Sequence, residues 1–203
     1  HVRSRRQRQM CIRDRSFDNR EGYLWQNGSL VEWKDAEVHV LNHGLQYASC
    51  VFEGERAYNG KIFESEIHTE RLFFSAKSLD MKIPFSQKEI LEAKNTLLKK
   101  NSLSNAYVRP VVWRGSEMMA VSAQSTKINV AIAVWEWPSY FDPDQKMQGI
   151  KLDIAKWRRP SPECGPVHAK AAGLYMICTL SKHEAEAKGY SDAVMLDWRG
   201  LIA

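Results

Sequence analysis

Long apolar runs are missing from this sequence of 203 residues. No segment approaches the ~18 to 20 consecutive apolar residues that a membrane-spanning helix needs, so no membrane partner is expected. Internal repeats and low-complexity segments are missing as well. The apolar share of 44% is nevertheless enough to bury a core, and the length suits one large domain or two small ones.

Cysteine is scarce, and its spacing carries no metal or disulfide motif. The absence of any CxxC arrangement argues against a disulfide framework or a zinc site and favours a reducing, cytoplasmic compartment. His39 and His43 have the i,i+4 spacing of a metal pair, but no HExxH motif surrounds them, and Asn42 and Gly44 favour a loop. No metal is therefore expected. The four cysteines are Cys11, Cys50, Cys164 and Cys178.

Acidic residues are nearly absent from residues 1–16, which contain six arginines and one aspartate. The remaining 23 lysines and arginines balance 23 acidic residues, so the pI of about 9.0 comes from this arm. Because the arm has no hydrophobic periodicity, we expect a disordered arm or a non-native read-through segment. An arginine arm can bind nucleic acid through phosphate contacts, but the neutral body offers no second basic surface. A nucleic-acid binder is therefore the alternative of another class, and no nucleic-acid partner is expected.

Residues 17–140 contain the signals of a small N-terminal α/β domain. Asn27-Gly28 and Asn59-Gly60 each separate two short apolar runs, which is a strong hairpin signal. Helical periodicity covers 66–80, and a capping box of Ser86 and Glu89 opens a second helix that ends at Lys100. The side chains expected on the buried side of the first helix are Ile67, Leu72, Ser75, Ala76 and Leu79. Those expected to be buried in the second are Ile90, Ala93, Leu97 and Leu98.

Two β-branched runs, 106–114 and 127–137, predict strands that complete this domain. A Pro- and Asp-containing stretch then interrupts the pattern from 138, and we assign 141–149 as an interdomain linker. Beyond it the sequence predicts a strand at 150–157, a helix at 171–188 ended by Gly189, and a strand at 193–197 that turns at Arg199-Gly200. We expect 150–203 to be the start of a larger second domain, cut short. The fold class is α/β (α+β).

Lys170 is the strongest candidate for a chemical role. It lies in the run 166–175 (PVHAKAAGLY), after a Pro- and Gly-rich loop and before the predicted helix. A lysine that forms a Schiff base needs room for a flat ring, which small neighbours leave, and partial burial, which favours the uncharged amine. The alternative interpretation of these residues is a solvated lysine in a first helical turn.

Two arginines lie among apolar residues. Arg71, in the first helix, either faces an anion such as a phosphate or pairs with Glu66 or Glu70. Tyr107 and Arg109 alternate along a predicted strand and so share one face. There Arg109 is either paired in the core or lines a site that receives a carboxylate. The aromatic residues form either a pocket or plain core; they are Phe52, Trp137 and Tyr140.

In combination, these segments resemble the start of a fold-type IV aminotransferase of the branched-chain kind. The resemblance begins with 38–47 (VHVLNHGLQY) and 51–58 (VFEGERAY), and it spans about 23–203. It implies a two-domain fold, pyridoxal 5'-phosphate as cofactor, and a homodimer or higher homo-oligomer. The implied reaction transfers the amino group between leucine, isoleucine or valine and 2-oxoglutarate. The further matching runs, in the same order, are 68–77, 106–110, 135–140 and 156–175.

The resemblance also implies a role for each matched residue. Lys170 would carry the cofactor and move the α-proton of the substrate, Arg71 would bind the cofactor phosphate, and Tyr175 would lie near the ring oxygen. Tyr107 and Arg109 would admit the side-chain carboxylate of glutamate. Arg56 would be a nearby arginine that helps hold this end of the substrate site. The residues implied at the aromatic pocket for an aliphatic side chain are Phe52, Trp137, Tyr140 and Tyr47, the last contributed by a partner subunit.

Two departures from the family qualify this expectation. Glu55 stands where the family usually has an apolar residue, which puts the local packing in doubt. The family's final third is expected to be missing, together with the glutamate that pairs with the pyridine nitrogen, so we expect this chain alone to be inactive. A D-amino-acid aminotransferase and an aminodeoxychorismate lyase share the fold, but the runs VFEGERAY and AYVRP favour the branched-chain group.

Overall fold

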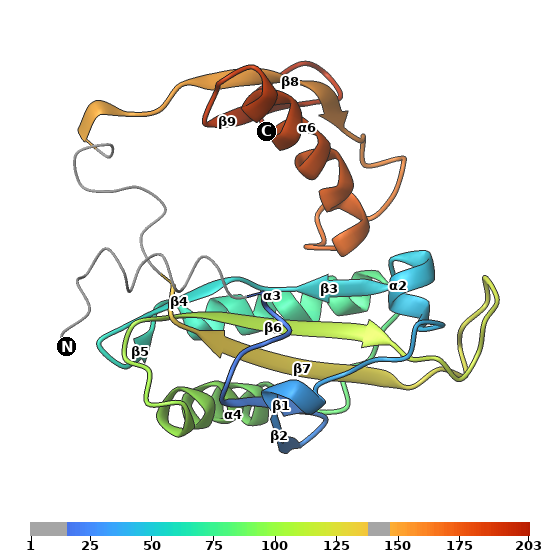
Figure 1. Cartoon of the computed structure of the whole chain (residues 1–203). Helices are drawn as coiled ribbons and strands as arrows, with labels where there is room; N and C mark the ends of the chain where they lie inside the picture. Colours follow the sequence, from blue (N-terminus) through green and yellow to red (C-terminus); the bar gives the residue numbers. More distant parts are fainter. Residues whose placement is uncertain (1–15, 138–146) are drawn as a thin grey trace.

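The structure is a computed structural model that describes residues 16–137 and 147–203. Most of its elements belong to one antiparallel sheet and the helices beside it (Figure 1). The strands are β1 (Tyr23–Gln26), β2 (Ser29–Glu32), β3 (Cys50–Phe52), β4 (Glu55–Tyr58), β5 (Lys61–Ile62), β6 (Ala106–Arg114), β7 (Ile128–Trp135), β8 (Leu152–Arg159) and β9 (Asp192–Asp197). The helices are α2 (His43–Tyr47), α3 (Ser65–Ser78), α4 (Gln87–Lys100) and α6 (Met176–Ala187), with 3-10 turns η1 (Trp33–Asp35) and η2 (Ala172–Tyr175).

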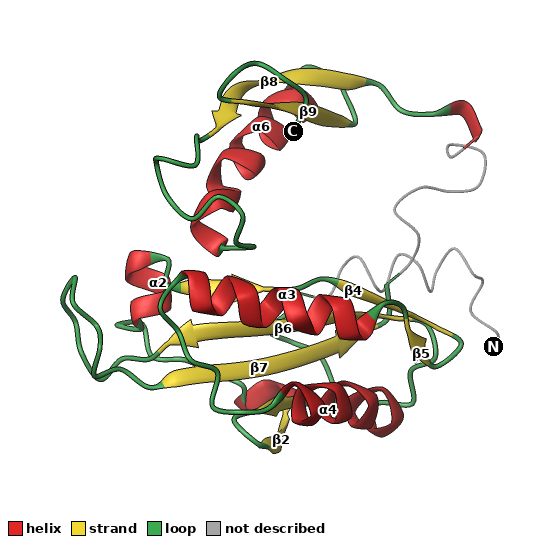
Figure 2. Cartoon of the chain, turned by 180° about the vertical axis from the view of Figure 1, so that it is seen from behind, coloured by secondary structure: helices red, strands yellow, loops and turns green. Residues whose placement is uncertain are grey.

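The large sheet has the order β2-β1-β7-β6-β4-β5, with β3 also paired to β6. All its pairings are antiparallel, whereas β8 and β9 form a separate parallel pair. Helices α3 and α4 cover the same face of the large sheet (Figure 2). The mixed α/β (α+β) class expected from the sequence is confirmed.

Both predicted hairpins are confirmed, and their turns explain why. Asn27 and Gly28 connect β1 to β2 with φ of +49° and +98°, and Asn59 and Gly60 connect β4 to β5 with φ of +50° and +78°. Two successive left-handed residues give the turn whose twist matches that of the strands, and asparagine and glycine adopt this conformation at the least cost.

Helices α3 and α4 also lie where the sequence predicts them, with one error in the buried face of α3. Ile67 is 61% exposed, because the side of α3 that meets the sheet carries Ser65 and Thr69 instead. The predicted capping box of Ser86 and Glu89 is present at the start of α4, and the predicted buried stripe of α4 is confirmed. Lys94, which was not expected there, is buried in that stripe.

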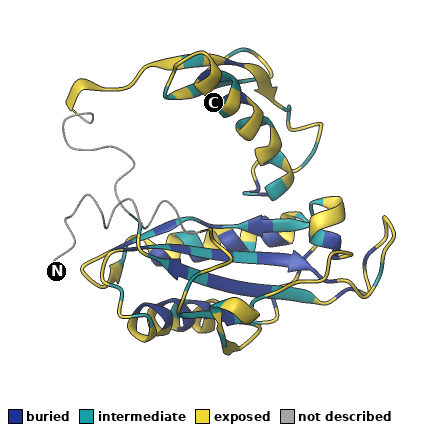
Figure 3. Cartoon of the chain, viewed as in Figure 1, coloured by how far each residue is buried: buried dark blue, intermediate teal, exposed yellow. Residues whose placement is uncertain are grey.

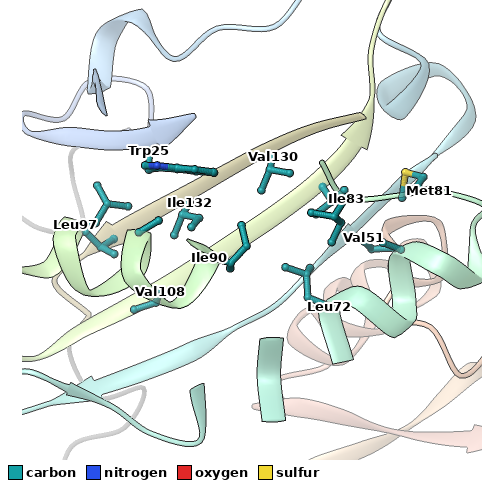
Figure 4. Packing of buried hydrophobic residues seen from close by; sticks show 14 of the residues in the cluster. Trp25, Val51, Leu72, Met81, Ile83, Ile90, Leu97, Val108, Val130 and Ile132 are labelled. Carbon is teal, nitrogen blue, oxygen red and sulfur yellow. The ribbon is translucent and has the colours of Figure 1, made fainter. Parts of the chain in front are cut away.

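The core lies between the large sheet and the two helices (Figure 4). Leu72 of α3 and Ile90 of α4 are fully buried against it, as are Val108 and Ile132 on neighbouring strands. Ala169 and Ala171, far along the chain, belong to the same cluster. The segment that carries Lys170 is therefore packed on the core of the large sheet.

The β8–α6–β9 unit is much more exposed than the large sheet (Figure 3). Its helix begins as η2, a 3-10 turn, and becomes α-helical only from Met176, a shorter α-helix than the predicted 171–188. Gly189 follows it with φ of +81°, as expected. The turn predicted at Arg199-Gly200 is present, and Ile202 pairs with Leu196 in an antiparallel bridge.

Candidate functional site

Lys170 is placed by the edge of the large sheet. Val51 of β3 and Ala171 form an antiparallel bridge, and the backbone N–H of Phe52 donates to the Lys170 carbonyl at 3.2 Å. The N–H of Lys170 donates to Oγ of Ser75, a buried residue of α3, at 2.9 Å. Both backbone groups of Lys170 are thus fixed by the sheet and its helix, so the side chain starts from a defined position.

The Lys170 side chain lies in a pocket of about 230 Å³ with Arg71 and Tyr175. Its Nζ is 2.6 Å from the Tyr175 hydroxyl and 5.1 Å from the centre of the Phe52 ring. No carboxylate pairs with Nζ in residues 16–137 and 147–203, so the amine faces a hydroxyl and an aromatic ring instead of an acid. The residues that line this pocket are Arg71, Arg159, Pro160, Val167, His168, Ala169, Lys170, Leu174, Tyr175, Ile177 and Cys178.

Arg71 reaches this pocket from α3 and is held by a buried carboxylate. Its Nε and Nη2 donate to the two oxygens of Glu53 at 2.6 and 2.7 Å, and His68 contacts the same carboxylate at 2.8 Å. Burial opposes the charge on Glu53, but the hydrogen bonds from Arg71 and His68 outweigh it and lower the pKa of the carboxyl. The edge of the guanidinium formed by Nε and Nη2 is therefore fixed, and Nη1, which has no hydrogen bond within the described residues, is left for an anion. The pairing with Glu66 or Glu70 considered from the sequence is wrong.

A line of aromatic and cationic side chains leads away from Lys170 along β3, β4 and β6. Phe52 packs on Tyr175 with ring centres 4.8 Å apart. The guanidinium of Arg109 lies 4.6 Å from the Phe52 ring centre, and its Nη2 donates to the Tyr107 hydroxyl at 3.0 Å. Tyr107 continues the line, with its ring centre 5.5 Å from that of Trp137.

Arg109 has no acidic partner in the described part of the chain, and its buried Nε makes no hydrogen bond there. Its neighbour Cys50 cannot supply a negative charge at neutral pH, because burial raises the pKa of that thiol to about 11 despite the opposing effect of Arg109. A partly buried guanidinium without a counter-ion is costly unless something else compensates it. The arrangement suits a ligand carboxylate.

The remaining predicted site residues fall into three groups. Arg56 joins the line, since its Nη2 donates to the Trp137 carbonyl at 3.3 Å. Tyr47 lies apart from it on α2, is 46% exposed, and stacks on His43 with ring centres 4.5 Å apart. Tyr140 lies outside the described residues, as do residues 1–15 and most of the expected linker.

Four residues at this site were not predicted from the sequence to have a functional role. Glu53 and Ser75 orient Arg71 and Lys170, and Arg159 lines the pocket with a single weak contact, to the Val167 carbonyl at 3.4 Å. Gly54 leaves room for Tyr107, because a Cβ there would come 2.1 Å from its hydroxyl. The signal for Gly54 and Glu53 was present in the run VFEGERAY, whereas Ser75 resembles an ordinary helix residue.

The described residues contain neither a metal cluster nor a helix suited to a membrane. No group of three or more metal-ligating side chains is found among them, and both ring nitrogens of His43 are taken, by Ser49 and by the Ala120 carbonyl. None of the helices in this part is long and apolar enough to cross a bilayer.

Comparison with known proteins gives a consistent set of relatives. The model of the family described as amino-transferase class IV matches residues 50–203. A probable branched-chain-amino-acid aminotransferase of Rickettsia typhi is 43% identical over 181 residues, which cover 89% of this chain and 62% of the relative. The branched-chain-amino-acid aminotransferase of Pseudomonas aeruginosa is 41% identical over 192 residues, covering 93% and 62%.

Solved structures agree with these sequences. A branched-chain amino acid aminotransferase of T.th. with pyridoxamine 5'-phosphate superposes with a TM-score of 0.86 at 35% identity, covering 91% of this chain and 62% of that one. The Escherichia coli branched-chain amino acid aminotransferase gives the same values. The chain thus spans about three fifths of the length of the relatives it matches.

Proposed function

Because the chain belongs to the class IV aminotransferases, we propose that it provides the lysine-bearing part of a pyridoxal-phosphate-dependent branched-chain amino-acid transaminase. Such an enzyme would move the amino group between leucine, isoleucine or valine and 2-oxoglutarate. Lys170, Tyr175 and Arg71 in one pocket carry the proposal. The domain division proposed with it is 17–140 for the small domain and 150–203 for part of the large one.

The lining of the pocket suits the two reactive groups of pyridoxal phosphate, its aldehyde and its phosphate. Lys170 presents an amine with no acidic partner among the described residues, which suits a lysine that binds an aldehyde. Arg71 would bind the phosphate through its remaining nitrogen. Arg159 lines the same pocket and would supply a second cation, which a doubly charged phosphate calls for because Glu53 already neutralises Arg71.

When bound, pyridoxal phosphate supplies the electron sink for the carbanion formed at the substrate's α-carbon. The chain's own residues would do the rest. Lys170 Nζ would take the α-proton and return it, since it is the amine at the reacting position. Tyr175, with its hydroxyl 2.6 Å from Nζ, would orient the amine and hold a proton beside it. Phe52 would exclude water from one side of the pocket.

Arg109 would define the second class of substrate. A leucine side chain would pack on the rings of Phe52 and Tyr107, whereas the carboxylate of glutamate needs a cation. Arg109 contacts both rings and has no competing acid in the described residues. Arg56, Trp137 and Tyr140 complete the proposed substrate pocket. One site would thus accept both an apolar and an acidic side chain.

A partner subunit would complete this pocket. Tyr47 lies on a segment whose large apolar side chains are exposed, which is typical of an interface. We therefore propose a homodimer, or a higher homo-oligomer, in which Tyr47 serves the neighbouring subunit. The free cysteines support a reducing, cytoplasmic location. The exposed apolar side chains are Val38, Val40, Leu41 and Leu45.

The substrate proposal is tested by Arg109→Ala, in this chain joined to the segment of the Pseudomonas aeruginosa relative that it does not span. Transamination with glutamate should fall about 10- to 100-fold, because a hydrogen bond to a charged group is worth ~1.5 to 3 kcal/mol. The leucine half-reaction should change little. Arg199→Ala, which removes an arginine that is exposed and pairs with Asp197, serves as the control. Equal losses for both substrates would refute this role of Arg109.

A further inference from the structure

Two buried charges lie outside the lining of the pocket and take no part in the reaction described above. Glu55 of β4 and Lys94 of α4 both have fully buried side chains, and Nζ of Lys94 is 2.7 Å from Oε1 of Glu55. Lysine and glutamate are almost never fully buried unless they are paired. This pair explains why an acidic residue, Glu55, can stand in the run VFEGERAY where an apolar residue was expected, because Lys94 lies opposite it and balances its charge.

The pair is tied to a third element, helix α3. Lys94 Nζ donates to the Thr69 hydroxyl at 2.7 Å and to that of Ser65 at 3.3 Å. The Ser65 hydroxyl in turn donates to the second oxygen of Glu55 at 3.0 Å. Strand β4 and helices α3 and α4 are therefore joined at one polar point inside an otherwise apolar core.

Burial disfavours the charged forms of Glu55 and Lys94, and the contact between the two residues favours them. Burial raises the pKa of Glu55 and lowers that of Lys94, whereas each partner's charge acts in the opposite direction. Two apolar side chains of similar volume would fill the same space without this cost, and such replacements are often neutral or stabilising. What the pair adds over apolar packing is a fixed geometry, because its hydrogen bonds allow one register of α3.

That register sets the position of Arg71. Thr69 and Arg71 are two residues apart on the same helix, so a shift or rotation of α3 at Thr69 moves the guanidinium. The buried pair also influences the position of Glu53, the carboxylate that holds Arg71, because only Gly54 separates Glu53 from Glu55. The contact between Glu53 and Arg71 thus joins the segment that carries Glu55 to α3, the helix that Lys94 holds through Thr69 and Ser65.

From this connection we infer that Glu55 and Lys94 are positioning residues that align Arg71 and Glu53 for an anion in the pocket. The anion is the phosphate of the cofactor, which rests on the function proposed above. Neither residue contacts the pocket itself. Their effect is transmitted through α3 and the segment Glu53-Gly54-Glu55.

The test compares Lys94→Met with the double variant Glu55→Ile/Lys94→Met, in the full chain. The first readout needs no cofactor: the NMR signal of the Arg71 Nε–H, which the 2.6 Å hydrogen bond to Glu53 protects from exchange. We expect this signal to be lost in Lys94→Met and to remain weak in the double variant, where the core is repacked without the polar connection. Thr69→Val is the milder variant, since it removes one contact of Lys94 and leaves the ion pair.

The second readout is the ratio of affinities for pyridoxal phosphate and pyridoxal, which lacks the phosphate. That preference should fall about tenfold in Lys94→Met and in the double variant, which corresponds to ~1.4 kcal/mol. Lys88→Met is the matched control, because Lys88 lies on the same helix with its side chain 84% exposed, and it should change neither readout.

The outcomes separate this inference from the proposed function. If the double variant is stably folded and keeps both the Arg71 signal and the preference, the pair is only structural and the inference is overturned. An unchanged Arg71 signal in Thr69→Val and Lys94→Met overturns it as well. If the signal is lost as expected but the original chain shows no preference for the phosphate form, the alignment of Arg71 stands and the cofactor assignment fails.

Discussion

The large sheet and the β8–α6–β9 unit differ in how they hold their shape. On the sheet, Val108, Val112 and Ile132 have no exposed surface, whereas Ile154 and Trp157 of β8 are 66% and 44% exposed. In sequence Lys170 belongs to the β8–α6–β9 unit, between β8 and α6, but its backbone is fixed by the sheet and α3, through Phe52, Ser75 and the bridge to Ala171. Lys170 thus takes its position from the well-packed region. Four substitutions test this difference.

The largest effect is expected in the core of the sheet. Leu72→Ala removes a fully buried side chain and should lower the free energy of unfolding by ~2 to 5 kcal/mol. Ile154→Ala in β8 should change it by no more than ~0.5 kcal/mol, because that side chain is mostly in water. Urea unfolding of both variants measures the contrast. Equal losses would mean that the two regions are equally packed.

A smaller effect is expected at Glu53, where the sheet meets the pocket. Glu53→Gln should lower the free energy of unfolding by about 1 to 3 kcal/mol at pH 7, since it removes a charge that is hydrogen-bonded to Arg71, whose side chain is half exposed. Burial acts against ionisation of Glu53, but Arg71 and His68 lower its pKa below 4.5.

The sign of its pH dependence follows from that direction. A lowered pKa in the folded state gives stability that is fully present above the unfolded value near 4.5 and is lost as the pH falls through the folded value. The difference between the original chain and Glu53→Gln should therefore shrink below about pH 4.5. Unfolding measured from about pH 7 to 3 checks this; a difference that stays constant over the range would rule out an ionised Glu53.

The smallest effect is expected at Ser75, the contact that ties Lys170 to α3. Ser75→Ala leaves the Lys170 N–H without its acceptor and should lower the free energy of local opening of the Lys170 segment by ~1 kcal/mol. Because the loss is local, hydrogen exchange at the Lys170 amide should speed up while exchange in β6 stays unchanged. Acceleration in both places would show that the Lys170 segment and the sheet open as one unit.

The parts of the fold predicted from the sequence are those decided over a few residues. Asn27-Gly28 fixes a hairpin because its two residues suit left-handed φ, and Ser86 with Glu89 fixes a helix start through reciprocal hydrogen bonds. Both signals act over a few neighbouring positions, so distant packing has little influence on them.

The partners of buried charges could not be predicted in this way. Arg71 pairs with Glu53, 18 positions earlier, in preference to the nearer Glu66 or Glu70, and Lys170 meets Ser75 across 95 positions. Which groups meet depends on how β3 and α3 pack, and no local rule carries that information. The misassigned Ile67 has the same origin, since hydroxyl groups on α3 face the buried Lys94 and take the inner positions.

The central claim is that Lys170 is the residue that binds the cofactor, and a trapping experiment tests it on the chain itself. The chain is mixed with one equivalent of pyridoxal phosphate, reduced with borohydride, digested and analysed by mass spectrometry, beside Lys170→Ala. We expect a pyridoxyl phosphate group on the peptide containing Lys170, and no comparable labelling of any lysine in the variant. A label spread over exposed lysines, equal in both proteins, would contradict it.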